Sequence, residues 1–385
     1  MFRGHLGRTL RILDHHYTPA AVMSIGVAVA LVWSALADQS YTTILNTRWI
    51  KHWPWPSGIA TVHLFVVSGL MTLFFFAVGL ELARELEQGL LVHARQSVPA
   101  LAGAVGGMTV TALMAVVVGY VVHSPALRHG WGIPMATDIA FTLAIVAMAG
   151  KGLPAALRIF LLTLAIADDV LSVMALTFVG ANHIRFVAVV LILVVTLGAR
   201  RLSRHRSSNA WRLFVLGALW LSFLWARVDP PLAGVLAALI VPFESVRTHR
   251  LERIMNRWSV GLVLPLFAVV SCGVHWSSLS MHAATVTIVT ATVGIRIVGK
   301  VVGITGGVAL ARAAHFRLDP LIRWPLLATG ALVCAIGFTV PLLFAGALFP
   351  QSSSAYGAFT VGLLIASLVA GSFGAVLLRL QARRY

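Results

Sequence analysis

Long apolar runs alternate with short polar connections along almost the whole chain. A helix needs about 20 mostly apolar residues to cross a bilayer, and most of the runs approach that length. The pattern predicts an all-α membrane protein with twelve transmembrane helices, in a single polytopic transmembrane domain over residues 1–385. The predicted spans are Ala20–Ala37, Val62–Leu82, Val98–Val122, Ile133–Ala149, Ile159–Val179, Phe186–Gly198, Leu213–Trp225, Leu232–Val241, Val260–Val274, Ala284–Leu310, Leu326–Leu348 and Ala358–Leu378.

Two of these spans contain residues that disrupt a helix. The fourth span opens with GIPMATD (residues 132–138), and the eleventh contains AIGFTVP (residues 335–341). One such segment alone would be an ordinary proline kink, which membrane helices tolerate. Interrupted hydrophobic segments in corresponding positions of two halves, however, are typical of the central ion or substrate site of a transporter. The pair, with Asp138 in one of them, favours two broken helices.

Composition and charge agree with a membrane protein. The chain is 59% hydrophobic and 11% charged, whereas a soluble protein is about a quarter charged. Its net charge of +17 does not indicate nucleic-acid binding, because the Lys and Arg residues fall mostly in alternate connections. This asymmetry is typical of cytoplasmic connections and predicts that both termini are cytoplasmic. The opposite side keeps only Arg48, Lys51, Arg128, Arg185 and Arg227.

Only three of the twelve acidic residues lie deep inside predicted spans, namely Asp138, Asp168 and Asp169. The deep basic residues are Arg296 and Lys300, both in the tenth span. A charge at the centre of a bilayer costs roughly 2.5–3.5 kcal/mol on insertion scales. Adjacent acids such as Asp168 and Asp169 therefore predict a functional site that faces protein, water or an ion.

Adjacent residues on a helix point about 100° apart, so Asp168 and Asp169 cannot share one partner equally. One can face an ion cavity while the other pairs with Lys300. Burial disfavours the charged form of a carboxylate, which can then hold a proton or a small hard cation but poorly both. This competition is the minimum needed to exchange Na⁺ or Li⁺ for H⁺. A buried ion pair that only fixes helix packing would need one acid, not two adjacent acids together with Asp138.

At these positions the chain resembles the NhaA-type sodium/proton antiporters of bacterial inner membranes, over nearly its whole length. The segments that carry the resemblance are PMATDIAF (residues 134–141), AIADDV (165–170), IVGKVVGI (297–304), Gly337-Phe338-Thr339, FFAVGLELAREL (75–86) and LPLFA (264–268). The aspartate pair and the ATDIAF segment are specific to this family in this order and spacing.

The resemblance implies twelve helices, inverted repeats formed by spans three to five and ten to twelve, and crossing of the broken spans four and eleven. It implies that Asp169 is the main Na⁺ ligand and that Asp168 is its proton-linked neighbour, paired with Lys300. Both aspartates would contact the metal ion. Thr137 and Asp138 would lie at the crossing, together with the break at Gly337, Phe338 and Thr339.

The same resemblance implies electrogenic exchange of cytoplasmic Na⁺ or Li⁺ for external H⁺, which supports pH and sodium homeostasis. It implies a non-enzymatic protein without cofactors, with the lipid bilayer and the ions as partners and a homodimer as a possible assembly. Four charged residues match positions that the family associates with cytoplasmic pH sensing, although a solvated helix end explains them equally well. They are Glu81, Arg84, Glu85 and Glu252.

The chain departs from the family pattern in three places. Residues 228–234 read VDPPLAG where the family usually has a histidine, the usual side chain for switching near neutral pH. Val301 replaces the proline that commonly follows the lysine. Arg296 lies one turn before Lys300 on the same helix face, where it either adds a cation at the site or faces another cavity. The sequence leaves these two placements of Arg296 open.

The departures keep two alternatives in view. The first is a family member with impaired or altered exchange, and the second is an organic-anion/sodium symporter on a related fold, which the extra cation would favour. An intramembrane aspartyl protease, with Asp138 and Asp169 as its pair, leaves Asp168 and Lys300 without a role.

Overall fold

A computed structural model of the chain describes residues 2–49, 60–88, 94–149, 152–179, 186–203, 208–226, 228–240, 246–276 and 282–383. Regular structure in these ranges is helical, and their one β-bridge joins Arg48 to Thr61. The helices are α1 (Phe2–Leu36), α2 (Asp38–Asn46), α3 (Val62–Leu64), α4 (Met71–Gln88), α5 (Ala94–Val121), α6 (Pro125–His129), α7 (Ile139–Met148), α8 (Ala155–Val179), α9 (Phe186–Ser203), α10 (Asn209–Ala226), α11 (Leu232–Ile240), α12 (Val246–Trp258), α13 (Leu264–Ser271), α14 (Ala283–Ala313), α15 (Trp324–Val333), α16 (Thr339–Leu348) and α17 (Ser354–Ala382). Two π-helical turns, Phe65–Leu70 and Ser259–Val263, join α3 to α4 and α12 to α13.

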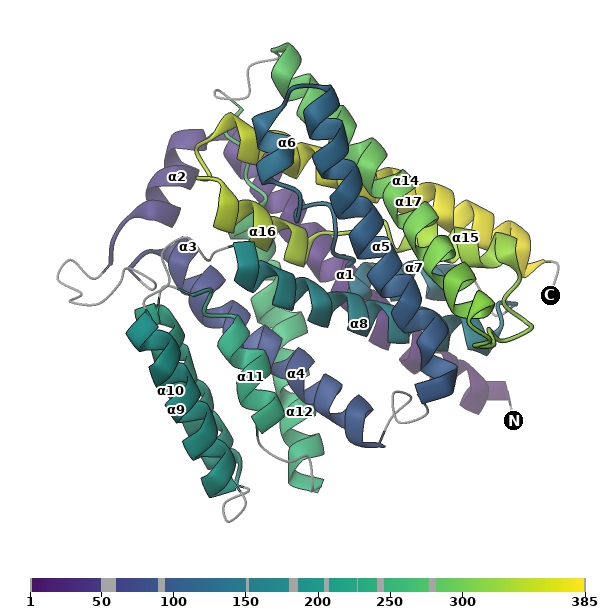
Figure 1. Cartoon of the computed structure of the whole chain (residues 1–385), viewed down its shortest axis with the longest axis horizontal. Coiled ribbons are helices and arrows are strands. Elements are labelled where there is room, and N and C mark those ends of the chain that lie inside the picture. The colour runs from purple at the N-terminus through teal and green to yellow at the C-terminus, as the bar shows by residue number, and fades with distance from the viewer. Residues whose placement is uncertain are drawn as a thin grey trace. The chain divides into compact units, whose positions relative to one another are not determined.

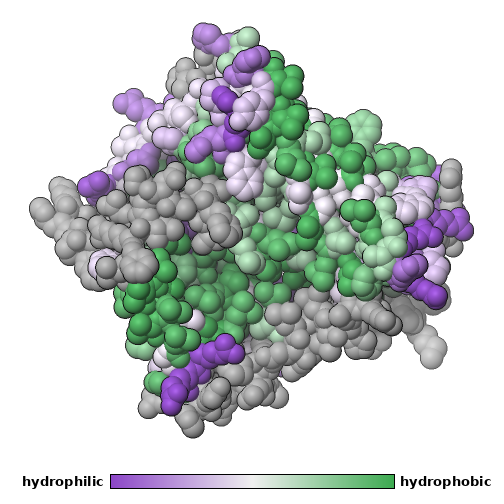
Figure 2. Space-filling model, in the orientation of Figure 1, coloured by the Kyte–Doolittle hydropathy of each residue, from purple (hydrophilic) through white to green (hydrophobic). Residues whose placement is uncertain are grey.

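The described part of the chain contains eight helices that are long and apolar enough to cross a membrane. Four shorter apolar helices accompany them, namely Ile139–Met148, Pro231–Ile240, Trp324–Val333 and Thr339–Leu348. Many large hydrophobic side chains stay exposed on the long helices, including Leu113, Val302 and Phe373. Figure 2 shows broad hydrophobic surfaces, which for side chains of this kind indicate contact with lipid. The protein is therefore a helical membrane protein, while the number of twelve spans stays a prediction.

The chain divides into two compact units that are interleaved in the sequence. The first contains residues 1–24, 93–173 and 274–385, and the second contains residues 25–92 and 174–273. A single transmembrane domain over residues 1–385 therefore stays a prediction.

In the first unit, α5 and α14 pack with their backbones in direct contact (Figure 1). A Cβ atom on Gly303 would lie 2.4 Å from the carbonyl oxygen of Gly106, and one on Gly307 would lie 2.0 Å from that of Ala102. Small residues permit this approach, which is a common way for membrane helices to associate. Leu161 and Ile304 belong to the hydrophobic core beside this contact. The glycines thus fix the helix that carries Arg296 and Lys300.

The same unit contains both helix breaks expected from the sequence. The chain leaves helical geometry between α6 and α7, around Pro134, and again between α15 and α16, around Gly337. The long helices α5 and α8 flank the first break in the sequence, and α14 and α17 flank the second.

In the second unit, α4 packs against α11 with comparable closeness, since a Cβ on Gly234 would lie 2.3 Å from the carbonyl oxygen of Thr72. The carbonyl of Ser68, in the π-helical turn before α4, accepts hydrogen bonds of 2.7 Å from the indole of Trp220 and from the hydroxyl of Thr72. Tyr41 links α2 to the end of α13 through a hydrogen bond of 2.8 Å to the carbonyl of Val269.

We expect Gly303→Ala to lower the thermal stability of the protein, because its methyl group would enter the backbone of α5 and overpacking of this kind costs about 1–3 kcal/mol. Gly306→Ala is the matched control on the same helix, since a Cβ there meets no atom within 4 Å. Thermal denaturation of both purified variants in detergent measures the effect. Equal melting temperatures would contradict the proposed role of this close approach.

Candidate functional site

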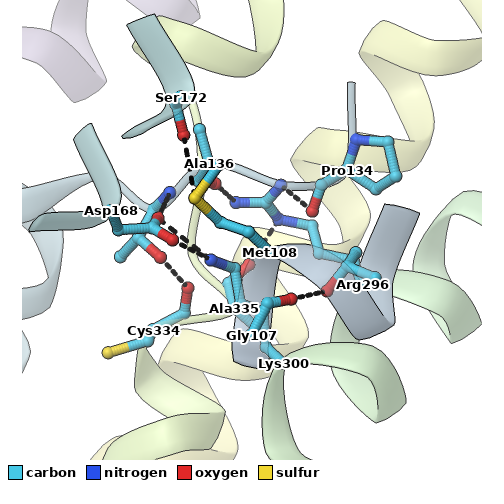
Figure 3. A network of polar contacts seen from close by, with 12 residues as sticks. Gly107, Met108, Pro134, Ala136, Asp168, Ser172, Arg296, Lys300, Cys334 and Ala335 are labelled. Carbon is cyan, nitrogen blue, oxygen red and sulfur yellow. Dashed lines mark hydrogen bonds and ion pairs between the residues drawn. The ribbon is translucent and has the colours of Figure 1, made fainter. Parts of the chain in front are cut away.

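Asp168 and Lys300 form a buried ion pair between α8 and α14. The ammonium of Lys300 donates to both carboxylate oxygens of Asp168, at 2.8 and 2.9 Å, and neither side chain is exposed. The carboxylate also accepts a hydrogen bond of 2.7 Å from the backbone N–H of Thr137, in the first break (Figure 3). Asp168 therefore binds one cationic side chain and one end of the broken backbone.

Asp138 lies at the point where the two breaks meet. Its carboxylate accepts hydrogen bonds from the backbone N–H groups of Ala140 and Phe141, at 3.1 and 3.3 Å, and so caps α7. The other carboxylate oxygen accepts from the hydroxyl and the N–H of Thr339, the first residue of α16, at 3.2 and 3.4 Å. One negative charge thus faces the positive N-terminal ends of two short helices.

The backbone groups that the two breaks leave without helical partners are also hydrogen-bonded. The N–H of Asp138 donates to the carbonyl of Ile336 at 2.9 Å, and the hydroxyl of Thr137 donates to that of Cys334 at 2.8 Å. The hydroxyl of Ser367 on α17 bonds both the N–H and the carbonyl of Gly337, each at 3.2 Å. Backbone groups in a membrane interior must be satisfied within the protein, and here the two breaks largely satisfy each other.

Arg296 forms its hydrogen bonds with backbone carbonyl groups. Its guanidinium donates to the carbonyls of Ala335 at 2.6 Å and Pro134 at 3.0 Å, and also to that of Ala136. The side chain is completely buried. The question that the sequence left open is answered by the tertiary structure, which places this cation on backbone oxygens of both breaks.

Asp169 follows Asp168 on α8 and is 5% exposed. Asp138 and Asp168 are 3% and 0% exposed, so all three deep acids are enclosed in this conformation. Within the described residues, no three His, Cys, Asp or Glu side chains converge as a metal cluster. A cation at this place would be bound by carboxylate oxygens supplemented by hydroxyl or carbonyl oxygens, the ligands that hard cations prefer.

Three of the four residues predicted to sense pH lie together in the second unit. Arg84 on α4 forms an ion pair of 2.7 Å with Glu252 on α12, and Glu81 lies 3.7 Å from Arg84. The imidazole of His249 lies 3.8 Å from the other oxygen of Glu252. Glu85 belongs to α4, but its side chain lies outside the described part of the structure.

Asp229 occupies the segment in which the family's histidine is missing. It lies between α10 and α11, where its carbonyl accepts a hydrogen bond of 3.2 Å from the N–H of Leu232. Burial raises the pKa of Asp229 to about 6, because the charged carboxylate loses solvation. This part of the chain therefore retains a group that titrates close to neutral pH, although the group is an acid.

Sequence patterns did not reveal the carbonyl partners of Arg296 or the contact between Ser367 and Gly337. Every residue has a carbonyl group, so a backbone acceptor leaves no signal in the sequence. The only indication was that Arg296 lies one turn from Lys300 in an apolar span.

The comparisons with known proteins agree with one another. The model of the family described as Na⁺/H⁺ antiporter 1 matches residues 10–378. The chain is 32% identical to the Na⁺/H⁺ antiporter NhaA 1 of Kineococcus radiotolerans, over 98% of this chain and 91% of the relative. It is 37% identical to the Na⁺/H⁺ antiporter NhaA of Thermobifida fusca, over 84% and 82%. It is 34% identical to the Na⁺/H⁺ antiporter NhaA 2 of Novosphingobium aromaticivorans, over 97% and 96%.

We expect Asp229→Asn to stabilise the protein relative to wild type increasingly as the pH rises from about 4 to about 6.5. The folded state binds this proton more tightly than the unfolded state, whose carboxyl has a pKa near 3.8, so the stability that Asp229 contributes is lost as pH rises through the folded pKa. Melting temperatures of both proteins in detergent across this range measure the difference. Asp319→Asn, which removes an exposed acid between α14 and α15, is the control. A constant difference for Asp229→Asn would contradict the raised pKa.

Proposed function

Because the chain belongs to the Na⁺/H⁺ antiporter 1 family, we propose that it exchanges cytoplasmic Na⁺ or Li⁺ for external H⁺ at its buried aspartate site. The proposal includes electrogenic exchange by alternating access, in the inner membrane of a bacterium with both termini in the cytoplasm. Such exchange would support pH and sodium homeostasis. Assembly as a homodimer stays a prediction.

The proposal rests mainly on the different surroundings of the adjacent residues Asp168 and Asp169. Asp168 is held by Lys300 and by the N–H of Thr137, whereas Asp169 points to a different side of α8 because neighbouring helical residues diverge by about 100°. We assign Asp169 as the main Na⁺ ligand and Asp168 as its proton-linked neighbour, which can also contact the ion. A proton and a Na⁺ ion compete for these oxygens, so binding of one releases the other.

The arrangement of the first unit supports inverted repeats. A long helix, a broken helix and a second long helix follow one another as α5, α6–α7 and α8, and again as α14, α15–α16 and α17. We propose that the two broken helices cross at Asp138 and Gly337–Thr339, with Thr137 at the same point, and that twelve helices cross the membrane. Since the three acids are enclosed in this conformation, ion release requires a change that opens the site to one side.

The ion pair of Arg84 and Glu252, with Glu81 and His249 beside it, supports a pH-sensing cluster between the C-terminal half of α4 and the N-terminal half of α12. We propose that protonation within this cluster regulates the exchange rate, with Glu85 as a further member from the sequence. The wholly buried ion pair of Asp168 and Lys300 has a different role in this proposal, because it belongs to the site that binds the transported ion.

The alternatives fare differently. The organic-anion symporter requires that Arg296 be available to bind an anionic substrate. Its guanidinium instead donates to three backbone carbonyls, which disfavours this alternative. A family member with impaired exchange is distinguished by flux alone. The relatives are named as antiporters and not as enzymes.

We expect Asp169→Asn to abolish Na⁺- and Li⁺-dependent proton flux, because an amide cannot exchange a proton for a cation. The assay follows a pH-sensitive dye in everted membrane vesicles, where an antiporter restores fluorescence when Na⁺ or Li⁺ is added. Asp319→Asn should keep wild-type flux, and equal amounts of both variants in the membrane must be verified. Normal flux in Asp169→Asn would remove this residue from the site, and a silent wild type would favour the impaired family member.

Electrogenic exchange predicts that membrane voltage changes the rate. In proteoliposomes containing the purified protein, a potassium diffusion potential set with valinomycin should accelerate or slow Na⁺-driven proton movement according to its sign. The same rate at both signs of the potential would contradict electrogenic exchange while leaving antiport itself intact.

A further inference from the structure

Arg296 is the deep charge for which neither the family resemblance nor the exchange mechanism supplies a role. It projects from α14, one turn before Lys300, and its guanidinium lies among three carbonyl oxygens (Figure 3). Two of these belong to Pro134 and Ala136 in the first break, and the third belongs to Ala335 in the second. The side chain is fully buried, so its contacts are made without competition from water.

These carbonyls are the groups that a broken helix leaves unsatisfied. α15 ends at Val333, and the carbonyls at the end of a helix carry partial negative charge. Backbone oxygens freed by a helix break are also ligands for Na⁺ in transporters. The guanidinium thus occupies the position in which a bound cation would otherwise find several oxygens at once.

The fit of the guanidinium depends on Gly337. A Cβ atom on this residue would lie 1.3 Å from Nη2 and 2.2 Å from Cζ of Arg296. Only glycine leaves the space, and the hydrogen bonds with Ser367 hold that part of the backbone in place. A lysine could not replace the arginine fully, because one ammonium group does not reproduce the planar fork of donors that reaches both breaks.

We infer that Arg296 has two roles. First, it is a positioning residue that joins the two breaks. Second, it is a specificity-determining residue, because it keeps the carbonyl oxygens of Pro134, Ala136 and Ala335 from binding the transported ion. Arg296 donates to the carbonyl of Ala136, and the N–H of the same peptide group, that of Thr137, donates to Asp168, so the positive charge lies close to the aspartate site and weakens its attraction for Na⁺. The second part rests on the proposed function, since it takes Na⁺ as the substrate. The first part concerns the fold and holds independently of transport.

Three variants of the full-length protein separate the charge from the geometry. Arg296→Met removes both, Arg296→Lys keeps the charge without the fork, and Arg317→Met removes an exposed arginine between α14 and α15 as a control. Each is purified for thermal denaturation in detergent and reconstituted in proteoliposomes, where proton flux is measured against Na⁺ concentration. The fit gives an apparent KM and a maximal rate separately.

We expect Arg296→Met to lower the melting temperature and to lower the apparent KM for Na⁺ by about threefold or more, because a repelling unit charge is removed from a poorly screened interior. Arg296→Lys should also lower the melting temperature but keep the KM within about twofold of wild type, since the charge remains. Arg317→Met should match wild type in both measurements. If Arg296→Met does not fold, a destabilised Arg296→Lys with an unchanged KM supports the inference.

A melting temperature of Arg296→Met equal to that of wild type would overturn the joining role. An unchanged or higher KM in Arg296→Met would overturn the effect on Na⁺, and full stability of Arg296→Lys would show that the fork geometry is unnecessary. A wild-type protein without flux would refute the proposed antiport, whereas the melting temperatures would still decide whether Arg296 joins the breaks.

Discussion

Backbone polar groups inside a membrane have no water to bond, and this constraint governs the centre of the first unit. Each helix break releases N–H and C=O groups that would be costly if left unsatisfied in hydrocarbon. In this protein, two buried charges of opposite sign form hydrogen bonds with these groups. Asp138 accepts from the N–H groups that begin α7 and α16, and Arg296 donates to carbonyls of both breaks. The breaks, which weaken each helix alone, are stabilised because they lie together.

Close backbone packing makes this arrangement geometrically possible. The glycines between α5 and α14, above all Gly106 and Gly303, bring the two helices near enough that α14 presents Lys300 and Arg296 from one face. Gly337 provides room for the guanidinium in the same way. A side chain at Gly106 or Gly303 would displace backbone, and one at Gly337 would displace the guanidinium of Arg296 and the carbonyl of Ala136. Small residues at these positions are therefore part of the site even though they have no polar group of their own.

The ion pair of Arg84 with Glu252 and that of Lys300 with Asp168 differ in what they imply. The side chain of Arg84 is 34% exposed while Glu252 is nearly buried, so water screens this attraction from one side and reduces its contribution to stability. Asp168 and Lys300 are wholly buried, and a buried pair is weak evidence for stability because desolvation offsets much of the Coulombic gain. The buried pair therefore makes most sense as part of the exchange that we propose. Asp169 beside it adds a second carboxylate that helix packing does not need.

The sequence by itself determined that the protein is a helical membrane protein, where its helices are interrupted, and which five charges lie deep in apolar segments. Hydropathy and charge reveal these features because the cost of burying Asp138, Asp168, Asp169, Arg296 or Lys300 depends mainly on the surrounding apolar run. The partners of these charges could not be predicted in the same way. The pairing of Lys300 with Asp168 was implied by the family resemblance and is present in the structure, whereas the bonds of Arg296 to the carbonyls of Pro134 and Ala335 were decided only by tertiary structure. The physical reason is that these partners lie far apart in the chain and include backbone oxygens, which every residue possesses and no sequence pattern distinguishes.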